Sequence, residues 1–241
     1  MNNVFKEVHI EKVSDKIADQ VIALIKDGKL VPGDKLPSER ELVKILGVGR
    51  SSLREALNRL EILGYVDIKK RKGIYVKSIC SAVQLDPLKK EVQDNLDKII
   101  QLYEVRGDIE QANAYHAALN RSAENIKELE TSLQTMQLSS TSPRFTWQRD
   151  QSFHGAVARS SRNIFRIHVL INILDFSKDL IQPIIEQFGN TEGNLPLIIK
   201  QHEDIVRAIA DRDPDTASEK MKIHLAWTNQ QFISYFQNQA T

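Results

Sequence analysis

The stretch LPSERELVKILGVGRSSLREALNRL, residues 36–60, decides the fold of the N-terminal part of this chain. Ser38, followed three residues later by Glu41, is the pattern of a helix capping box, and Gly47 is a typical residue for the end of a helix. Between them, residues at helical spacing form one apolar face, made of Leu42, Ile45 and Leu46. The stretch therefore predicts a short amphipathic helix, a glycine turn and a second helix.

The second predicted helix begins at Arg50 or Ser51 and carries polar residues on its exposed first turn. Its inward positions are apolar, namely Leu53, Ala56, Leu57 and Leu60. The residues left exposed are Arg50, Ser51, Ser52 and Arg54. In a helix-turn-helix, this turn of the second helix reaches base edges and phosphates. The pattern predicts a DNA-binding helix, and the two arginines disfavour the alternative of a winged helix used only for protein contact.

The sequence on either side completes a small domain. Residues 64–68 and 74–76 alternate between apolar and polar side chains, which predicts a β-hairpin with a basic turn over residues 69–73. Upstream, a helix that ends at Gly28 is predicted by apolar residues at a 3.6-residue period, which are Val13, Ile17, Val21, Leu24 and Ile25. Three helices and a hairpin, about 70 residues in all, make a winged helix domain.

Two segments carry a resemblance to a known family: LVPGDKLPSEREL, residues 30–42, and GVGRSSLREAL, residues 47–57. Over residues 10–77 the chain resembles the N-terminal domain of the GntR family of bacterial transcription regulators. The resemblance implies double-stranded DNA as the partner, with the tip of the wing entering the minor groove. The positions that it assigns to operator contact are Arg40, Arg50, Ser51, Ser52, Arg54, Lys72 and Gly73.

The basic charge of the chain is concentrated in its first 77 residues. These contain 16 Lys and Arg against 11 Asp and Glu, a net charge of +5. The remaining residues contain 17 against 21, a net charge of −4, so the whole chain has a formal charge of only +1. This division indicates a phosphate-binding surface in the N-terminal part. By themselves, residues 69–72 would suit a solvated basic turn, and their place next to a helix-turn-helix favours DNA.

Composition limits the class and the compartment of the protein. A length of 241 residues suits two modest domains, and 41% hydrophobic content is enough for a core in each. Cys80 is the single cysteine, which excludes an internal disulfide and a thiolate metal cluster. There is no run of about 18 apolar residues and no signal-like N-terminal segment. We therefore expect a cytoplasmic protein without a membrane partner.

A break in the regular patterns divides the chain into two domains. Residues 1–78 form the predicted winged helix-turn-helix, and residues 79–92, with the Asp86-Pro87 step, form a predicted linker. Residues 93–241 follow a helical pattern almost to the end. The predicted fold class is mainly α: a winged helix with a small β-hairpin, followed by an all-helical bundle that binds metal and effector.

Four residues of the second domain suggest metal chemistry. Asp150 and His154 are four residues apart on a predicted helix, so their side chains lie on the same face. His202 begins, and His224 lies within, two later predicted helices. Three imidazoles and one carboxylate suit zinc, nickel, cobalt or manganese better than calcium or magnesium. Spacing alone leaves open a simple Asp–His ion pair and structural histidines.

A second resemblance is carried by DQSFH, residues 150–154, and HEDIVRAI, residues 202–209, together with His224. Over residues 93–235 the chain is similar to the all-helical FCD effector domain of the FadR-type branch of the same family. The resemblance implies a divalent metal beneath a pocket for a small carboxylate, held by Asp150, His154, His202 and His224. Members that bind long acyl-CoA thioesters tend to lack this full set, which argues against such an effector.

One arginine is a candidate for effector binding. Arg106 matches an arginine usual in the first helix of this domain and would pair with the carboxylate of the effector. The alternative is a surface arginine that bridges Glu110 four residues later.

A metal-dependent enzyme with an accessory winged helix is the alternative function. His202-Glu203 begins like the HExxH helix of zinc proteases, but Val206 stands where the second histidine is required. No spacing places a general base, so no catalytic residue is expected.

These features together predict a homodimeric regulator, and the family resemblance implies that it is a repressor. Two symmetry-related recognition helices would read a short palindromic operator, because a single winged helix buries little surface. A small carboxylate or hydroxy acid bound at the metal would change the operator affinity.

Overall fold

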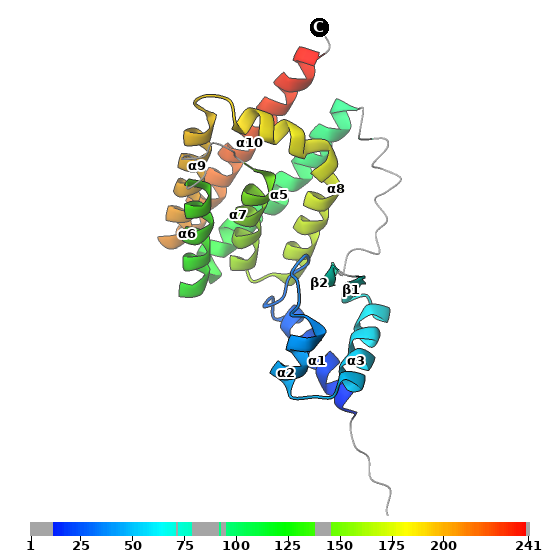
Figure 1. The fold of residues 1–241 in the computed structure, drawn as a ribbon. Helices are drawn as coiled ribbons and strands as arrows, with labels where there is room; N and C mark the ends of the chain where they lie inside the picture. Colours follow the sequence, from blue (N-terminus) through cyan, green and yellow to red (C-terminus); the bar gives the residue numbers. More distant parts are fainter. Residues whose placement is uncertain (1–11, 71, 79–91, 93–94, 138–145, 240–241) are drawn as a thin grey trace, which may run out of the picture. The chain divides into compact units, whose positions relative to one another are not determined.

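The computed structural model describes residues 12–70, 72–78, 92, 95–137 and 146–239. Contacts between Cα atoms divide the chain into two compact units, Met1–Ile79 and Cys80–Thr241, and each is described by itself. Except for Val92, the linker predicted over residues 79–92 lies outside the described residues. The predicted fold class is confirmed, because the described residues form long helices and a single small hairpin (Figure 1).

The first unit is a helix-turn-helix followed by a hairpin. Its elements are α1 (Val13–Lys26), α2 (Glu39–Leu46), α3 (Arg50–Ile62), β1 (Val66–Lys69) and β2 (Gly73–Val76). The predicted capping box is present: the backbone N–H of Ser38 donates to the Glu41 carboxylate at 2.8 Å, and the Ser38 hydroxyl accepts from the Glu41 N–H. Gly47 ends α2 in the left-handed conformation, with φ of 64°. The turn chemistry of the sequence therefore fixes both ends of α2.

The core of the first unit differs from the prediction at Ile45, which is 68% exposed. The residues of α2 that pack on the core are Leu42, Val43 and Leu46. At 100° per residue, Ile45 lies more than a quarter turn away from the centre of that face. Val13, at the first position of α1, is also half exposed, whereas the later apolar residues Ile17, Val21 and Ile25 are buried.

The hairpin has a third, irregular neighbour that the sequence did not predict. β1 and β2 pair antiparallel with Val66 opposite Val76, and the segment before α2 pairs with the other edge of β2. The Leu36 N–H donates to the Ile74 carbonyl at 2.9 Å, and the Val76 N–H donates to the Asp34 carbonyl at 2.9 Å. This pairing covers the free edge of β2 and fixes the wing relative to the start of α2.

The described residues of the second unit form a bundle of long helices. These are α5 (Leu96–Asn120), α6 (Ala123–Gln137), α7 (Trp147–Ser160), α8 (Ile164–Gly189), α9 (Asn194–Ala210) and α10 (Pro214–Gln239). α5 packs along α10 and α7, and α6 packs on α7 and α9 (Figure 1). Among the described residues, no helix has the length and apolar character needed to cross a membrane.

Two apolar clusters fill this bundle, and a polar layer separates them along the helices. One cluster includes Ala114, Ala156, Ile205 and Met221. The other includes Tyr103, Trp147, Ile198 and Phe232. On the same four helices, the sequence positions between these residues hold the buried polar groups Arg106, Glu110, Asp150, His154, His202 and His224. The bundle thus holds charged groups at one level between two apolar ends.

α8 contains a proline in its interior, Pro183. Proline lacks the backbone N–H and crowds the preceding turn, so helices bend there. Figure 1 shows α8 changing direction in its yellow part. After the bend, Ile184, Ile185 and Phe188 pack with the second apolar cluster. The end of α8 therefore lies against the core of the bundle.

The Ser38→Ala variant tests the capping box. Removal of the hydroxyl acceptor should destabilise α2 by about 1 kcal/mol, so hydrogen exchange of the amides of residues 39–46 in the full-length chain should accelerate roughly fivefold. Ser38→Thr retains the hydroxyl and should exchange like the wild type. Equal exchange in Ser38→Ala and the wild type would show that the cap adds nothing to α2.

Candidate metal centre and DNA-binding face

Four buried side chains from three helices converge on one point. Asp150 and His154 lie on α7, His202 on α9 and His224 on α10, and one ligand atom from each lies within 4.8 Å of all the others. The sequence predicted His202 at the beginning of a helix, but it lies in the middle of α9, which begins at Asn194. The predicted set of four is therefore brought together in the structure.

The separations between these ligand atoms suit a single divalent ion. The Nε2 atoms of His202 and His224 are 3.1 Å apart, and Asp150 Oδ1 is 3.8 Å from His202 Nε2. His154 Nε2 is 3.7 Å from Asp150 Oδ2. Two ligands at about 2.1 Å from one metal lie about 3 to 4 Å apart. No hydrogen-bond partner for the buried His154 Nε2 lies within range among the described residues, so the arrangement fits a metal centre.

Each histidine is held through its other ring nitrogen, which leaves Nε2 directed at the centre. His154 Nδ1 contacts the Glu110 carboxylate, and His224 Nδ1 lies 2.9 Å from Gln201 Oε1. His202 Nδ1 lies 3.2 Å from the Met136 sulfur. We assign the Nδ1–H tautomer to all three rings when they ligate, since each Nδ1 faces an acceptor. Partners of this kind orient the ring and increase its basicity toward a metal.

The site binds protons unevenly. Burial alone would lower the pKa of His154, but the carboxylates of Glu110 on α5 and Asp150 on α7 outweigh it and raise the pKa to about 9. Burial and the charge of His154 lower the pKa of His224 to about 3, and burial with the neighbouring His224 lowers that of His202. In the metal-free protein at neutral pH, His154 is therefore charged while His202 and His224 are neutral.

Arg106 is buried, not on the surface as in the alternative that the sequence left open, but it does pair with Glu110. Its Nε donates to Glu110 Oε1 at 2.5 Å, and its Nη1 donates to the Tyr103 hydroxyl at 3.3 Å. Glu110 is thus shared between Arg106 and His154. Sequence reasoning noticed Glu110 only through its spacing from Arg106 and missed its contact with the metal site, which needs the packing of α5 on α7.

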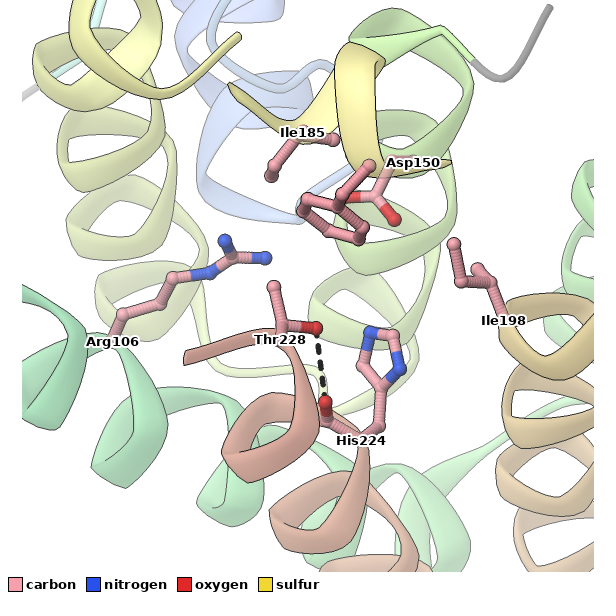
Figure 2. Close-up of a pocket in the computed structure, with 7 residues that line it drawn as sticks. Arg106, Asp150, Ile185, Ile198, His224 and Thr228 are labelled. Carbon is pink, nitrogen blue, oxygen red and sulfur yellow. Dashed lines mark hydrogen bonds between the residues drawn. The ribbon is translucent and has the colours of Figure 1, made fainter. Parts of the chain in front are cut away.

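A small cavity lies beside the four ligands (Figure 2). It is lined by Arg106, Asp150, Ile185, Phe188, Ile198, His224 and Thr228. The guanidinium of Arg106 points into the space that Asp150, Thr228 and His224 surround. The volume of the cavity is about 10 Å³, which is enough for one water molecule or one small ion. A cationic group and two of the candidate metal ligands therefore face the same small cavity.

The predicted DNA-contacting residues lie on the surface of the first unit. Arg40, Arg50, Ser51, Arg54 and Lys72 are exposed, and Ser52 and Gly73 are half-buried. A groove between the start of α2 and the hairpin includes Arg40, Lys72 and Gly73 together with Lys35, Lys69 and Lys70. Lys35 was not singled out from the sequence. It lies in the groove because the segment before α2 pairs with β2.

Two local features suit this face to an anionic partner. The N-cap of α3 is Gly49, which has no side chain to accept from the first backbone N–H groups, and this end of the helix therefore suits an anion. Gly73 has a φ of +121°, a backbone conformation that strains any residue with a Cβ, so the turn of the basic wing favours glycine at this position. Arg54 pairs with Glu39 at 2.9 Å on the surface, an exposed ion pair of the kind that exchanges readily.

Comparison with known proteins identifies both units. Residues 13–76 match the family model described as bacterial regulatory proteins, gntR family, and residues 101–226 match that of the FCD domain. The solved structure described as Streptococcus agalactiae GntR has a TM-score of 0.53 with 24% identity, covering 90% of this chain and 99% of that one, which supports the fold.

Curated relatives are similar along nearly the whole chain. The "Putative L-lactate dehydrogenase operon regulatory protein" of Escherichia coli strain K12 is 29% identical over 235 residues, 95% of this chain and 90% of the relative. The transcriptional regulator LutR of Bacillus subtilis is 28% identical, covering 89% and 98%. The transcriptional repressor NanR of Klebsiella aerogenes is 28% identical, covering 89% and 83%. These relatives are named as regulators, which supports a regulator rather than the alternative of an enzyme. The chain belongs to the GntR family of transcription regulators, in the FadR-type branch that carries a C-terminal FCD domain.

Proposed function

We propose that this regulator is a repressor whose operator affinity is controlled by a small carboxylate bound at a divalent metal in the helical domain. The convergence of four buried ligand atoms beside a buried arginine carries the proposal. Zinc, nickel and manganese are the candidates, since imidazole and carboxylate ligands suit such ions. Four protein ligands leave two positions of an octahedral ion for the effector. Because the cavity in this structure has room for about one water molecule, apolar lining residues such as Ile185 and Phe188 would have to move aside to admit a carboxylate. The ion would fix the effector as a Lewis acid, and the protein would supply the surrounding charge.

The charge of the loaded site favours an anionic ligand. Arg106 and a divalent ion bring three positive charges, whereas Glu110 and Asp150 bring two negative ones, and ligating histidines are neutral. The buried layer then carries a net charge of +1. Unbalanced charge is costly away from water, so a monocarboxylate that completes the neutral set is stabilised.

The names of relatives support the class of effector and the direction of control. The E. coli relative is named for an L-lactate dehydrogenase operon, and lactate is a small hydroxy acid. The K. aerogenes relative is named as a repressor. We therefore propose a short hydroxy acid or carboxylate as the effector, which releases the protein from DNA.

The proposed DNA-binding form is a homodimer on a palindromic operator. Arg50, Ser51, Ser52 and Arg54 on α3 would contact the major groove, and Arg40 the backbone beside it. Lys72 and Gly73 would bring the wing to the minor groove. The exposure of these side chains and the groove that Arg40, Lys72 and Gly73 line support these roles.

The His202→Ala variant tests the metal site. The loss of one ligand atom should weaken zinc binding by more than the roughly 10–100-fold that the loss of a supporting hydrogen-bond partner costs. Metal content of the purified protein and thermal shifts with acetate, L-lactate and succinate measure this, with lactamide as an uncharged control. DNA binding and the dimer should persist.

His116→Ala removes a histidine outside the cluster and should bind zinc like the wild type. His202→Gln fills the space of the imidazole and guards against a general folding defect. Unfolding of both His202 variants would show that the residue is structural, and normal zinc content would contradict the site.

The affinity for metal should fall as the pH is lowered, because each ion that binds displaces one proton. In the metal-free protein the raised pKa of His154, about 9, means that an ion must displace one proton at any pH below 9. The lowered pKa values of His202 and His224 add no further proton until far lower pH. From pH 8 to pH 5, the affinity should therefore decrease about tenfold per pH unit.

Calorimetry of zinc binding in buffers of different ionisation enthalpy measures the protons released, and one per ion is expected at pH 7. A flat affinity between pH 8 and pH 5 would contradict the displacement of a proton from His154 by the ion. A slope near three would contradict the uneven proton binding described for the cluster.

The Arg54→Ala variant tests the DNA-binding face. Loss of a base or phosphate contact should cost about 1–3 kcal/mol, a reduction of roughly 5–150-fold in operator affinity. The operator would be selected from random duplexes with wild-type protein, and affinity measured at one fixed salt concentration. Arg207→Ala on α9, another exposed arginine, is the control and should bind normally. Unchanged affinity in Arg54→Ala would contradict the assigned recognition helix.

A further inference from the structure

We infer that Glu110 is the shared positioning residue of the site: one carboxylate holds the metal ligand His154 and the effector-facing Arg106 at the same time. The inference rests on the proposed metal and effector site and assigns a new role within it. Glu110 is 1% exposed and lies on α5, whereas the metal ligands come from α7, α9 and α10. It is therefore the link between the metal site and the helix that carries the arginine.

One oxygen of Glu110 binds the Nε side of the Arg106 guanidinium. Its Oε1 accepts from Arg106 Nε, and the Tyr103 hydroxyl accepts from Nη1. A guanidinium has five N–H groups in a fixed plane, so three remain after these two bonds. Arg106 lines the cavity and points into it (Figure 2). Glu110 thus fixes the plane of the guanidinium and leaves N–H groups for a carboxylate ligand.

On the other side, Glu110 fixes the ring of His154. Its second oxygen, Oε2, contacts His154 Nδ1. An acceptor at Nδ1 keeps the proton there, so Nε2 can present its lone pair to a metal. Both oxygens of Glu110 are therefore used as acceptors, one for each functional group.

A carboxylate is the side chain that this double role requires. Glutamine has the same shape but offers one acceptor oxygen and one NH₂ donor. If the amide oxygen in a Glu110→Gln variant accepted from Arg106, the NH₂ would face His154 Nδ1 and force the proton to Nε2, where it would block the metal. If the amide were flipped, the NH₂ would face the Arg106 N–H. Either orientation disturbs one of the two groups.

The other ring partners make useful contrasts. His224 faces the neutral amide of Gln201, and His202 faces the Met136 thioether, a weak acceptor. Of the three contacts to Nδ1, the one from Glu110 alone involves a charged acceptor, and charge-assisted hydrogen bonds are the strongest. Replacement of Glu110 should therefore weaken zinc affinity more than replacement of Met136.

The test compares four proteins with the wild type: Glu110→Gln, Arg106→Met, Met136→Leu and, as the matched control, Glu104→Gln, which makes the same chemical change at an exposed position of α5. Zinc affinity is measured by calorimetry, L-lactate affinity is measured at saturating zinc, and the visible spectrum of the Co²⁺-loaded protein reports the ligands of the ion.

Glu110→Gln should lose about 10–100-fold in zinc affinity, bind L-lactate more weakly even at saturating zinc, and change the Co²⁺ spectrum. Arg106→Met should lose L-lactate binding but keep zinc affinity within about threefold and the same Co²⁺ spectrum. Met136→Leu and Glu104→Gln should resemble the wild type in both affinities. A purely structural role for Glu110 would lower the melting temperature without altering the spectrum.

The removal of one charge from a buried pair can itself prevent folding. The double variant Arg106→Met/Glu110→Leu removes both charges of the pair, keeps the net charge of the wild-type layer and leaves no acceptor for His154 Nδ1, so it should still show the weakened zinc affinity. Wild-type zinc affinity and Co²⁺ spectrum in the double variant, or wild-type affinities for both zinc and L-lactate in a folded Glu110→Gln, would overturn the inference. Absence of zinc binding by the wild-type protein would instead overturn the proposed function.

Discussion

The helical domain depends on the mutual compensation of charges that are buried with almost no access to water. Arg106, Glu110, His154 and Asp150 form a continuous series of opposite charges that runs from α5 to α7. None of these groups could be buried alone, because an unpaired charge in a protein interior costs several kcal/mol. The series therefore determines which faces of α5 and α7 meet. A rotation of either helix by one residue, 100°, would leave charges without partners.

The two apolar clusters on either side of this layer have a corresponding role. They fix the positions of α5, α7, α9 and α10 along their axes, so that polar residues far apart in the sequence meet at one point. His202 packs face to face with Phe153, with the ring centroids 4.1 Å apart, and this contact sets the plane of the imidazole. The polar layer specifies the register of the helices, while apolar burial supplies the main stabilisation.

Predictions from the sequence were accurate for residues close together in the chain and failed for contacts between distant segments. The capping box at Ser38 and the Asp150–His154 pair were predicted correctly, because both depend on spacing within one helix. The assembly of His202 and His224 with that pair was suggested by a family resemblance, since spacing alone left structural histidines open. The prediction that Ile45 lies on the apolar face of α2 was wrong, because two turns of helix contain several plausible apolar faces and packing on the core decides among them. The roles of Glu110 and of the segment that pairs with β2 depend on contacts between separate elements, which no local pattern encodes.

In the proposed sensor, the bend at Pro183 separates two properties that would otherwise have to change together. The metal ligands come from α7, α9 and α10, whereas the residues of α8 that close the cavity, Ile185 and Phe188, follow the proline. Proline removes one backbone hydrogen bond at that point, so the last turns of α8 are less rigidly tied to the rest of the helix. Under the proposed function, exchange of these two apolar side chains would alter the size and shape of the acid that the cavity accepts. The proposed metal ligands and Arg106 would stay unchanged, so proteins that respond to different acids could keep the same four ligands.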